Sequence, residues 1–125
     1  MIQDNRVLLV KRNKEPAKGQ WAIPGGSVKL GETLRAAVER EIQEESGLIV
    51  KARDPVYTFD VIERDDKGQI RFHYVIIDFT ADLVGGDLLA SDDADDARWF
   101  SPEEIEGERV NETTKRFLRK MNFLR

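Results

Sequence analysis

The stretch from Gly26 to Leu48 reads GSVKLGETLRAAVEREIQEESGL, and its pattern decides how the whole chain is interpreted. A helix is predicted over Thr33 to Ser46, because a threonine can cap a helix start and Gly47 suits the left-handed residue that commonly ends one. An apolar stripe repeats every four residues along this helix: Leu34, Val38 and Ile42. The stretch therefore predicts an amphipathic helix between two loops.

The same helix carries three carboxylates in an unfavourable place. At about 100° per residue, Glu41, Glu44 and Glu45 fall within an arc of roughly 100° that borders the apolar stripe. They lie in the last two turns, where the helix dipole disfavours each anion by a few tenths to about 1 kcal/mol, and their like charges repel. Such local conflicts often mark functional sites, and a divalent cation would remove this one. The alternative is a solvated acidic face on which Arg40 pairs with Glu44.

Composition limits the chemistry that the chain can perform. Its 125 residues suit one domain over 1–125. There is no cysteine and only one histidine, His73, so a metal ion would be held by oxygen, which favours Mg²⁺, Mn²⁺ or Ca²⁺. The net charge of −4 argues against nucleic-acid polymers as partners, although a bound cation could still attract a small anion. Neither a membrane-spanning run nor a signal-peptide pattern is present, so we expect a cytoplasmic protein.

The remaining sequence is mainly predicted strand, with one later helix. An acidic loop is expected over 92–96, and a turn at 65–68 is predicted to form the tip of a hairpin. Val75 to Ile77 is expected to be central in its strand. Strands are predicted at 6–11, 49–53, 56–63, 69–81 and 97–100, with a short extended piece at 21–24, a helical turn from Ser101 and a helix at 113–121. This order predicts an α+β fold in which helices cover mixed strands.

The quoted stretch resembles the Nudix box: Gly, five residues, Glu, seven residues, Arg-Glu, an aliphatic, any residue, Glu-Glu, any residue, Gly, an aliphatic. Every fixed position is present: Gly26, Glu32, Arg40, Glu41, Ile42, Glu44, Glu45, Gly47 and Leu48. WAIPGG before the box and RVLLVKR further upstream look like the usual family flanks. Many members carry Glu where this chain has Lys29, outside the fixed pattern. The resemblance implies the Nudix α/β/α sandwich, a mixed sheet between helices.

One departure from the family concerns the first strand. Only Met1 to Asp4 precede the segment that matches the family, so that strand is expected to be shortened or trimmed. An exposed sheet edge would invite a partner chain, and we expect a homodimer.

The resemblance also implies a reaction and the residues that perform it. The reaction is Mg²⁺-dependent hydrolysis of a pyrophosphate bond, with Mn²⁺ as a substitute metal. The expected ligands are Glu41, Glu45, Glu44 and the carbonyl of Gly26. Arg40 would orient a neighbouring glutamate, and Glu32, with Gly47, would serve the structure of the box.

The general base is either a box glutamate, Glu44 or Glu41, or an acid from a later loop. The candidate in that loop is Asp93, with Asp92 and Asp96 as competitors, and the plainer interpretation is a solvated acidic loop.

For the substrate, likeness of the region from Phe72 to Phe100 suggests ADP-ribose. The alternatives are a nucleoside triphosphate and, in another class, a Nudix-fold module that binds without catalysis. Candidate substrate contacts are Trp21, Phe72, Tyr74 and Arg12, although aromatic residues are also common in cores. His73 is interpreted as a polar strand residue.

Overall fold

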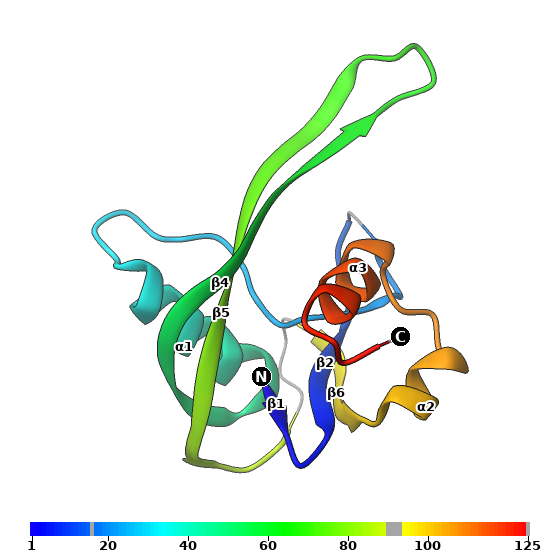
Figure 1. The fold of residues 1–125 in the computed structure, drawn as a ribbon. Helices are drawn as coiled ribbons and strands as arrows, with labels where there is room; N and C mark the ends of the chain where they lie inside the picture. Colours follow the sequence, from blue (N-terminus) through cyan, green and yellow to red (C-terminus); the bar gives the residue numbers. More distant parts are fainter. Residues whose placement is uncertain (16, 90–93, 125) are drawn as a thin grey trace.

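The computed structural model describes residues 1–15, 17–89 and 94–124. Three helices accompany the strands of two sheets in this part of the chain (Figure 1). The elements are, in order, β1 (Ile2–Gln3), β2 (Arg6–Arg12), β3 (Trp21–Ala22), α1 (Leu34–Ser46), β4 (Leu48–Arg64), β5 (Ile70–Gly86), β6 (Ala94–Phe100), α2 (Pro102–Glu106) and α3 (Glu112–Lys120). The predicted helix and terminal helix are confirmed to within one residue at each end.

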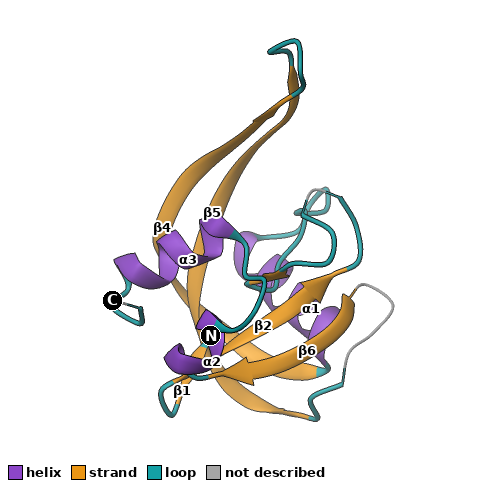
Figure 2. Ribbon diagram, turned by 90° about the vertical axis from the view of Figure 1, so that its right-hand side faces the viewer, coloured by secondary structure: helices purple, strands orange, loops and turns teal. Residues whose placement is uncertain are grey.

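The strand β2 is the centre of the first sheet. It pairs antiparallel with β6 along its whole length, from Val7 opposite Phe100 to Arg12 opposite Ala94. Its other edge is shared by β1 near one end and β3 near the other. A parallel bridge joins Trp21 to Val110, which brings the segment before α3 alongside β3. Figure 2 shows β2 and β6 side by side beneath the loops that lead to α1.

Both faces of this sheet are covered. Val7 and Leu9 point to one side and pack with Ile105 of α2 and Phe117 of α3. Leu8 points to the other side and packs with Ile42 of α1 and with Leu48 and Val50 of β4. Alternating residues of a strand face opposite ways, so a run of apolar residues is expected where both faces are buried. The layering of helices on either side of the sheet confirms the predicted α+β sandwich.

The second sheet is one long hairpin, which differs from the two shorter strands predicted before the turn. The strand β4 is continuous over 17 residues and pairs with β5 from Leu48 opposite Gly86 to Arg64 opposite Ile70. The break expected at Pro55 is absorbed as register shifts. The outer half of the hairpin projects well beyond the sandwich (Figure 1). The predicted central segment, Val75 to Ile77, lies near the middle of β5, with Val75 65% exposed and Ile76 and Ile77 half-buried.

Two further predictions need correction. The acidic segment is not a loop throughout, because Ala94 to Asp96 already belong to β6. Leu34, at the start of the predicted apolar stripe, is 44% exposed and lines an open hollow with Pro55 and Phe79, whereas Ala37 is buried. No helix in the described ranges has the length and apolar character that a membrane crossing requires.

Candidate active site

The helix α1 is fixed at both ends by its own sequence. The side chain of Thr33 accepts a hydrogen bond from the amide of Ala36 at 3.1 Å, which caps the first turn. Gly47 ends the helix with φ of 79° and donates its amide to the carbonyl of Gln43. A Cβ at Gly47 would also collide with the carbonyl oxygen of Asp87, so both conformation and space require glycine. These caps fix the register that sends the glutamates into one cleft.

Arg40 joins the carboxylates of this helix to the preceding loop. Its Nε and Nη2 donate to the two oxygens of Glu32 at 2.7 and 2.9 Å. Its Nη1 donates to Glu41 at 2.8 Å and to Glu44 at 3.1 Å. The guanidinium, together with the backbone amide of Lys29, lowers the pKa of Glu32 to about 2. Arg40 therefore relieves much of the repulsion between carboxylates that the sequence predicts, so a metal ion is not the only group that can do so.

The fourth carboxylate, Glu45, is held differently. Its side chain is only 6% exposed and accepts a hydrogen bond from the amide of Gly25 at 2.9 Å. Gly26 lies so close to Glu41 that a Cβ there would overlap its carboxylate. The backbone of 25–26 thus runs directly over two glutamates of α1, and only a residue without a side chain permits this approach at Gly26.

A cleft of about 430 Å³ lies between this helix and two loops. Its lining residues come from the β2–β3 loop, the loop before α1, and α1 itself: Arg12, Asn13, Lys14, Gly25, Gly26, Ser27, Lys29, Arg40, Glu41, Glu44 and Glu45. Four of these side chains are cationic and three are carboxylates. The lining is therefore net positive in a chain whose net charge is −4. A larger, mostly apolar hollow of about 510 Å³ at the start of α1 contains none of the predicted site residues.

The donor set of the cleft suits a hard divalent cation. All available ligands are oxygens, and the close approach of Gly26 to Glu41 places a backbone segment beside a carboxylate. Among the described residues, however, no three acidic or histidine side chains already surround a common point. Arg40 binds Glu41 and Glu44, and Glu45 binds an amide, so these oxygens would have to turn toward a bound ion.

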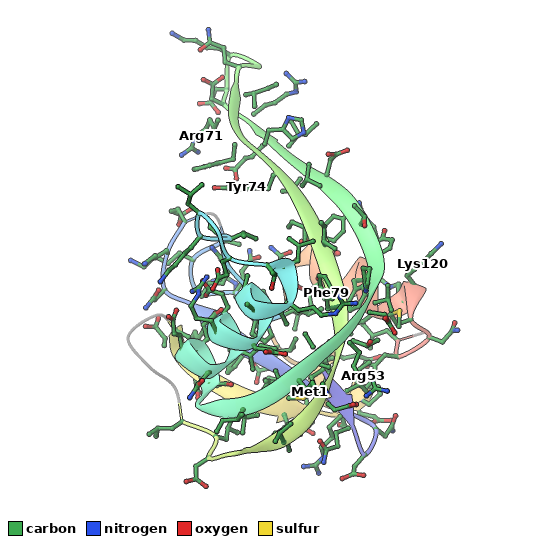
Figure 3. All side chains as sticks on the ribbon, turned by 90° about the vertical axis from the view of Figure 1, so that its left-hand side faces the viewer. Met1, Arg53, Arg71, Tyr74, Phe79 and Lys120 are labelled. Atoms are coloured by element: carbon green, nitrogen blue, oxygen red, sulfur yellow. The ribbon has the colours of Figure 1, made fainter. Side chains whose placement is uncertain are left out.

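Several predicted substrate contacts lie outside the cleft. Trp21 is 4% exposed and packs edge-on against Phe100 with 4.8 Å between ring centroids, while Arg98 covers its ring. This corrects the expectation that Trp21 offers a stacking surface, because no ring face is open to a base. Phe72 and Tyr74 stack on one another, 5.8 Å apart, on the hairpin. Figure 3 shows Tyr74 on the projecting part of the hairpin, beyond α1.

The polar candidates of the later chain that the structure describes, His73 and Asp96, are also separate from the cleft. His73 lies on the exposed hairpin, 3.4 Å from Asp60. Asp96 accepts hydrogen bonds from the amide of Ala97 and the guanidinium of Arg98. Asp93, like Asp92, lies outside the described residues.

Four polar cleft residues were not singled out from the sequence: Asn13, Lys14, Ser27 and Lys29. Lys14, Asn13 and Ser27 lie in loops, and no local signal distinguishes them from ordinary solvated loop residues. Lys29 does carry a signal, because it stands within the box at a position where many family members have an acid.

Comparison with known proteins agrees with this arrangement. The profile of the NUDIX domain matches residues 1–121. An ADP-ribose pyrophosphatase of Methanocaldococcus jannaschii is 45% identical over 98 residues, which is 78% of this chain and 56% of that protein. The nucleoside triphosphatase NudI of Salmonella arizonae is 34% identical over 119 residues, covering 86% of this chain and 79% of the relative.

A solved structure also matches the chain. A bifunctional NMN adenylyltransferase/ADP-ribose pyrophosphatase of Francisella tularensis, crystallised with AMP and a manganese ion, matches with a TM-score of 0.68 at 27% identity. The match covers 97% of this chain and 38% of that one. The chain thus spans just over half the length of the Methanocaldococcus relative and a smaller part of this two-activity protein. A capped glutamate helix, an arginine that gathers its carboxylates and a domain-wide sequence match lead to one conclusion: the chain belongs to the Nudix family.

Proposed function

We propose that this chain hydrolyses a pyrophosphate linkage in a nucleoside diphosphate derivative with the help of a divalent cation. The observation that carries the proposal is the mixed charge of one cleft, in which three carboxylates of α1 meet four cations. Carboxylates alone would suit a metal ion, and cations alone would suit a phosphate. Both together suit a pyrophosphate bound through a metal, since the substrate brings negative charge and the ion positive charge.

The proposed metal is Mg²⁺, which Mn²⁺ could replace. Its ligands would be Glu41, Glu45 and Glu44 with the carbonyl of Gly26, an oxygen set of the kind that Mg²⁺ prefers. The Francisella protein, 38% of which this chain matches, was crystallised with a manganese ion, which is consistent with the use of a divalent ion. When bound, the ion supplies charge neutralisation at the phosphoryl oxygens and a lowered pKa of water.

The residues of the chain then position the reaction. Water attacks one phosphorus, the bond from that phosphorus to the bridging oxygen breaks, and the bridging oxygen leaves with the second phosphoryl group. We propose that Glu44 takes the proton of the attacking water, because its side chain is 40% exposed within the cleft. Arg40 holds Glu41 and Glu44 in place through one nitrogen. Asp93, which lies outside the described residues, is the alternative base.

The proposed substrate is ADP-ribose. The support is the 45% identity to the Methanocaldococcus protein, whose name gives that activity. A nucleoside triphosphate is the second candidate, because the Salmonella relative that is covered to 79% of its length carries that activity in its name. Arg12, which lines the cleft, would contact the phosphates, whereas Phe72 and Tyr74 would meet the nucleoside only if it extends toward the hairpin.

We further propose that the chain forms a homodimer through its projecting hairpin. A lone two-stranded ribbon is marginally stable in water, and Ile62 and Val75, which share one face of this one, are 48% and 65% exposed. Packing against the same surface of a second copy would cover them. A light-scattering mass of one chain at micromolar concentration would refute this.

The test of the function is product formation from a panel of nucleotide substrates with Mg²⁺. The panel contains ADP-ribose, other nucleoside diphosphate sugars and nucleoside triphosphates, and it compares the wild type with Glu45→Gln. We expect turnover of ADP-ribose by the wild type and a loss of at least a hundredfold in the variant. Glu103→Gln, on the exposed side of α2, is the matched control and should retain full activity. Failure of the wild type to turn over any substrate would overturn the proposal and favour a module that only binds.

A further inference from the structure

Two lysines come from different loops to the rim of the glutamate cleft. Lys14 lies in the loop between β2 and β3, and Lys29 in the loop before α1, yet both line the same space as Glu41 and Glu44. Neither lysine forms a salt bridge with any carboxylate among the described residues. Arg40, by contrast, already binds three carboxylates. The positive charge that remains for a ligand therefore includes these two lysines.

The backbone of Lys29 is hydrogen-bonded directly, and the loop of Lys14 is fixed at its base. The amide of Lys29 donates to Glu32 at 3.0 Å, and its carbonyl accepts from the amide of Glu32 at 3.0 Å. Since Glu32 is itself held by Arg40, Lys29 is tied to α1 through a chain of hydrogen bonds. The loop of Lys14 is closed at its base, where Arg12 exchanges backbone hydrogen bonds with Gly19 and Gln20. A flexible ammonium on a fixed base can reach an anion without reorganising the loop.

Removing the two lysines would reverse the charge of the cleft. Without them, Arg12 and Arg40 would face three glutamates. Such a lining would hold metal more tightly and repel a phosphate. The lysines therefore weaken the binding of the metal ion and strengthen the binding of the phosphate.

We propose that Lys14 and Lys29 form a clamp for the phosphoryl oxygens of the substrate. This inference rests on the proposed pyrophosphate substrate. The clamp recognises the pyrophosphate itself rather than a base or sugar. It should therefore matter equally for a nucleoside diphosphate sugar and for a nucleoside triphosphate.

The experiment measures binding without turnover, for the wild type, Lys14→Ala, Lys29→Ala and the double variant. The probes are Mn²⁺ alone and then inorganic pyrophosphate in the presence of Mn²⁺, both followed by calorimetry. At a partly exposed site each lysine should strengthen pyrophosphate binding roughly fivefold. The double variant should bind Mn²⁺ at least as tightly as the wild type. Lys18→Ala is the matched control, because Lys18 is an exposed lysine of the same loop and does not line the cleft.

The clamp predicts that the double variant binds pyrophosphate more weakly but Mn²⁺ no more weakly, and this contrast can reject it. Weaker binding of both Mn²⁺ and pyrophosphate would mean that the substitutions damage the cleft, and the clamp would be rejected. Pyrophosphate affinity within twofold of wild type in the double variant would reject it as well. In steady-state assays we expect KM to rise by the same factor for ADP-ribose and a nucleoside triphosphate.

These results separate the clamp from the proposed function. A wild type that binds pyrophosphate through the lysines but hydrolyses nothing would refute the function and keep the clamp. Hydrolysis that is unchanged in the double lysine variant would keep the function and refute the clamp.

Discussion

The guanidinium of Arg40 grips the carboxylate of Glu32 through two parallel hydrogen bonds, from Nε at 2.7 Å and from Nη2 at 2.9 Å. The two residues are eight positions apart, one in the loop before α1 and one within the helix. Because the same guanidinium also reaches Glu41 and Glu44, the pair fixes the loop against the face that carries the proposed metal ligands. This double contact matches the planar fork of arginine, which lysine cannot reproduce.

The first prediction concerns the acid stability of this pair. The pKa of Glu32 is about 2 in the folded chain against about 4.5 without its partners, and the main cause is its hydrogen bond from Arg40. A depressed pKa contributes stability above the unfolded value, and that contribution is lost as pH falls from about 4.5 toward 2. Glu32→Gln should therefore lose less of its unfolding free energy over that window than the wild type does. Urea melts at pH 5 and pH 3 measure this, and equal losses would contradict it.

The second prediction separates two glycines of the box. Gly47→Ala should lower the unfolding free energy by about 1–3 kcal/mol, because φ of 79° is strained for alanine and its Cβ meets the carbonyl of Asp87. Gly26→Ala should change stability by less than about 0.5 kcal/mol, since its Cβ meets only the movable end of Glu41.

Gly26→Ala should instead weaken Mn²⁺ binding by about tenfold or more, because Glu41 must leave its place. Thermal melts and calorimetric titration of both variants check the contrast. A large stability loss in Gly26→Ala with unchanged metal affinity would show that Gly26 serves only the fold.

A third prediction concerns the addition of metal. A ligand that binds only the folded chain stabilises it by about 2.7 kcal/mol at a free concentration a hundred times its Kd. Saturating Mg²⁺ should therefore raise the melting temperature of the wild type, and chelation should reverse the rise. Glu45→Gln should lose most of this shift, whereas Glu103→Gln should keep it. An equal shift in all three proteins would place the bound ion elsewhere.

The fourth prediction concerns Asp78 of β5. Its burial raises its pKa to about 6, and the amino group of Met1 limits that rise. A raised carboxyl pKa favours the protonated folded state, so this contribution to stability is lost as pH increases from about 4 to about 6. Asp78→Asn should therefore be more stable than the wild type at pH 7, with a smaller difference at pH 4. Thermal melts at the two pH values decide this, and a constant difference would refute the assignment.

Several features could be predicted because neighbouring residues determine them. Thr33 and Gly47 bound α1 as expected, since a cap involves groups only a few residues apart. Ser101 likewise starts α2 with a capping box to Glu104. The turn at Asp65 to Gly68 closes the hairpin where the sequence placed it, through a hydrogen bond from Gly68 to Asp65.

Other features could not be predicted, because the burial of a residue depends on partners that are distant in the sequence. Nothing near Trp21 shows that Phe100 and Arg98 will enclose its ring. Nothing near Val75 shows that its strand will leave the sandwich and stand in solvent, since an apolar run suits a buried strand equally well.

The sequence by itself determined the family, the helix and the set of glutamates, because a periodic pattern and two caps fix which side chains share a helical face. Only the tertiary structure decided what faces that helix. Lys14 and Lys29 reach the cleft from two separate loops, and Gly25 and Gly26 lie over the glutamates because the chain folds back on α1. Charge balance in a cleft is a sum over residues that meet only after folding, so it is settled by the arrangement of the elements and not by any one of them.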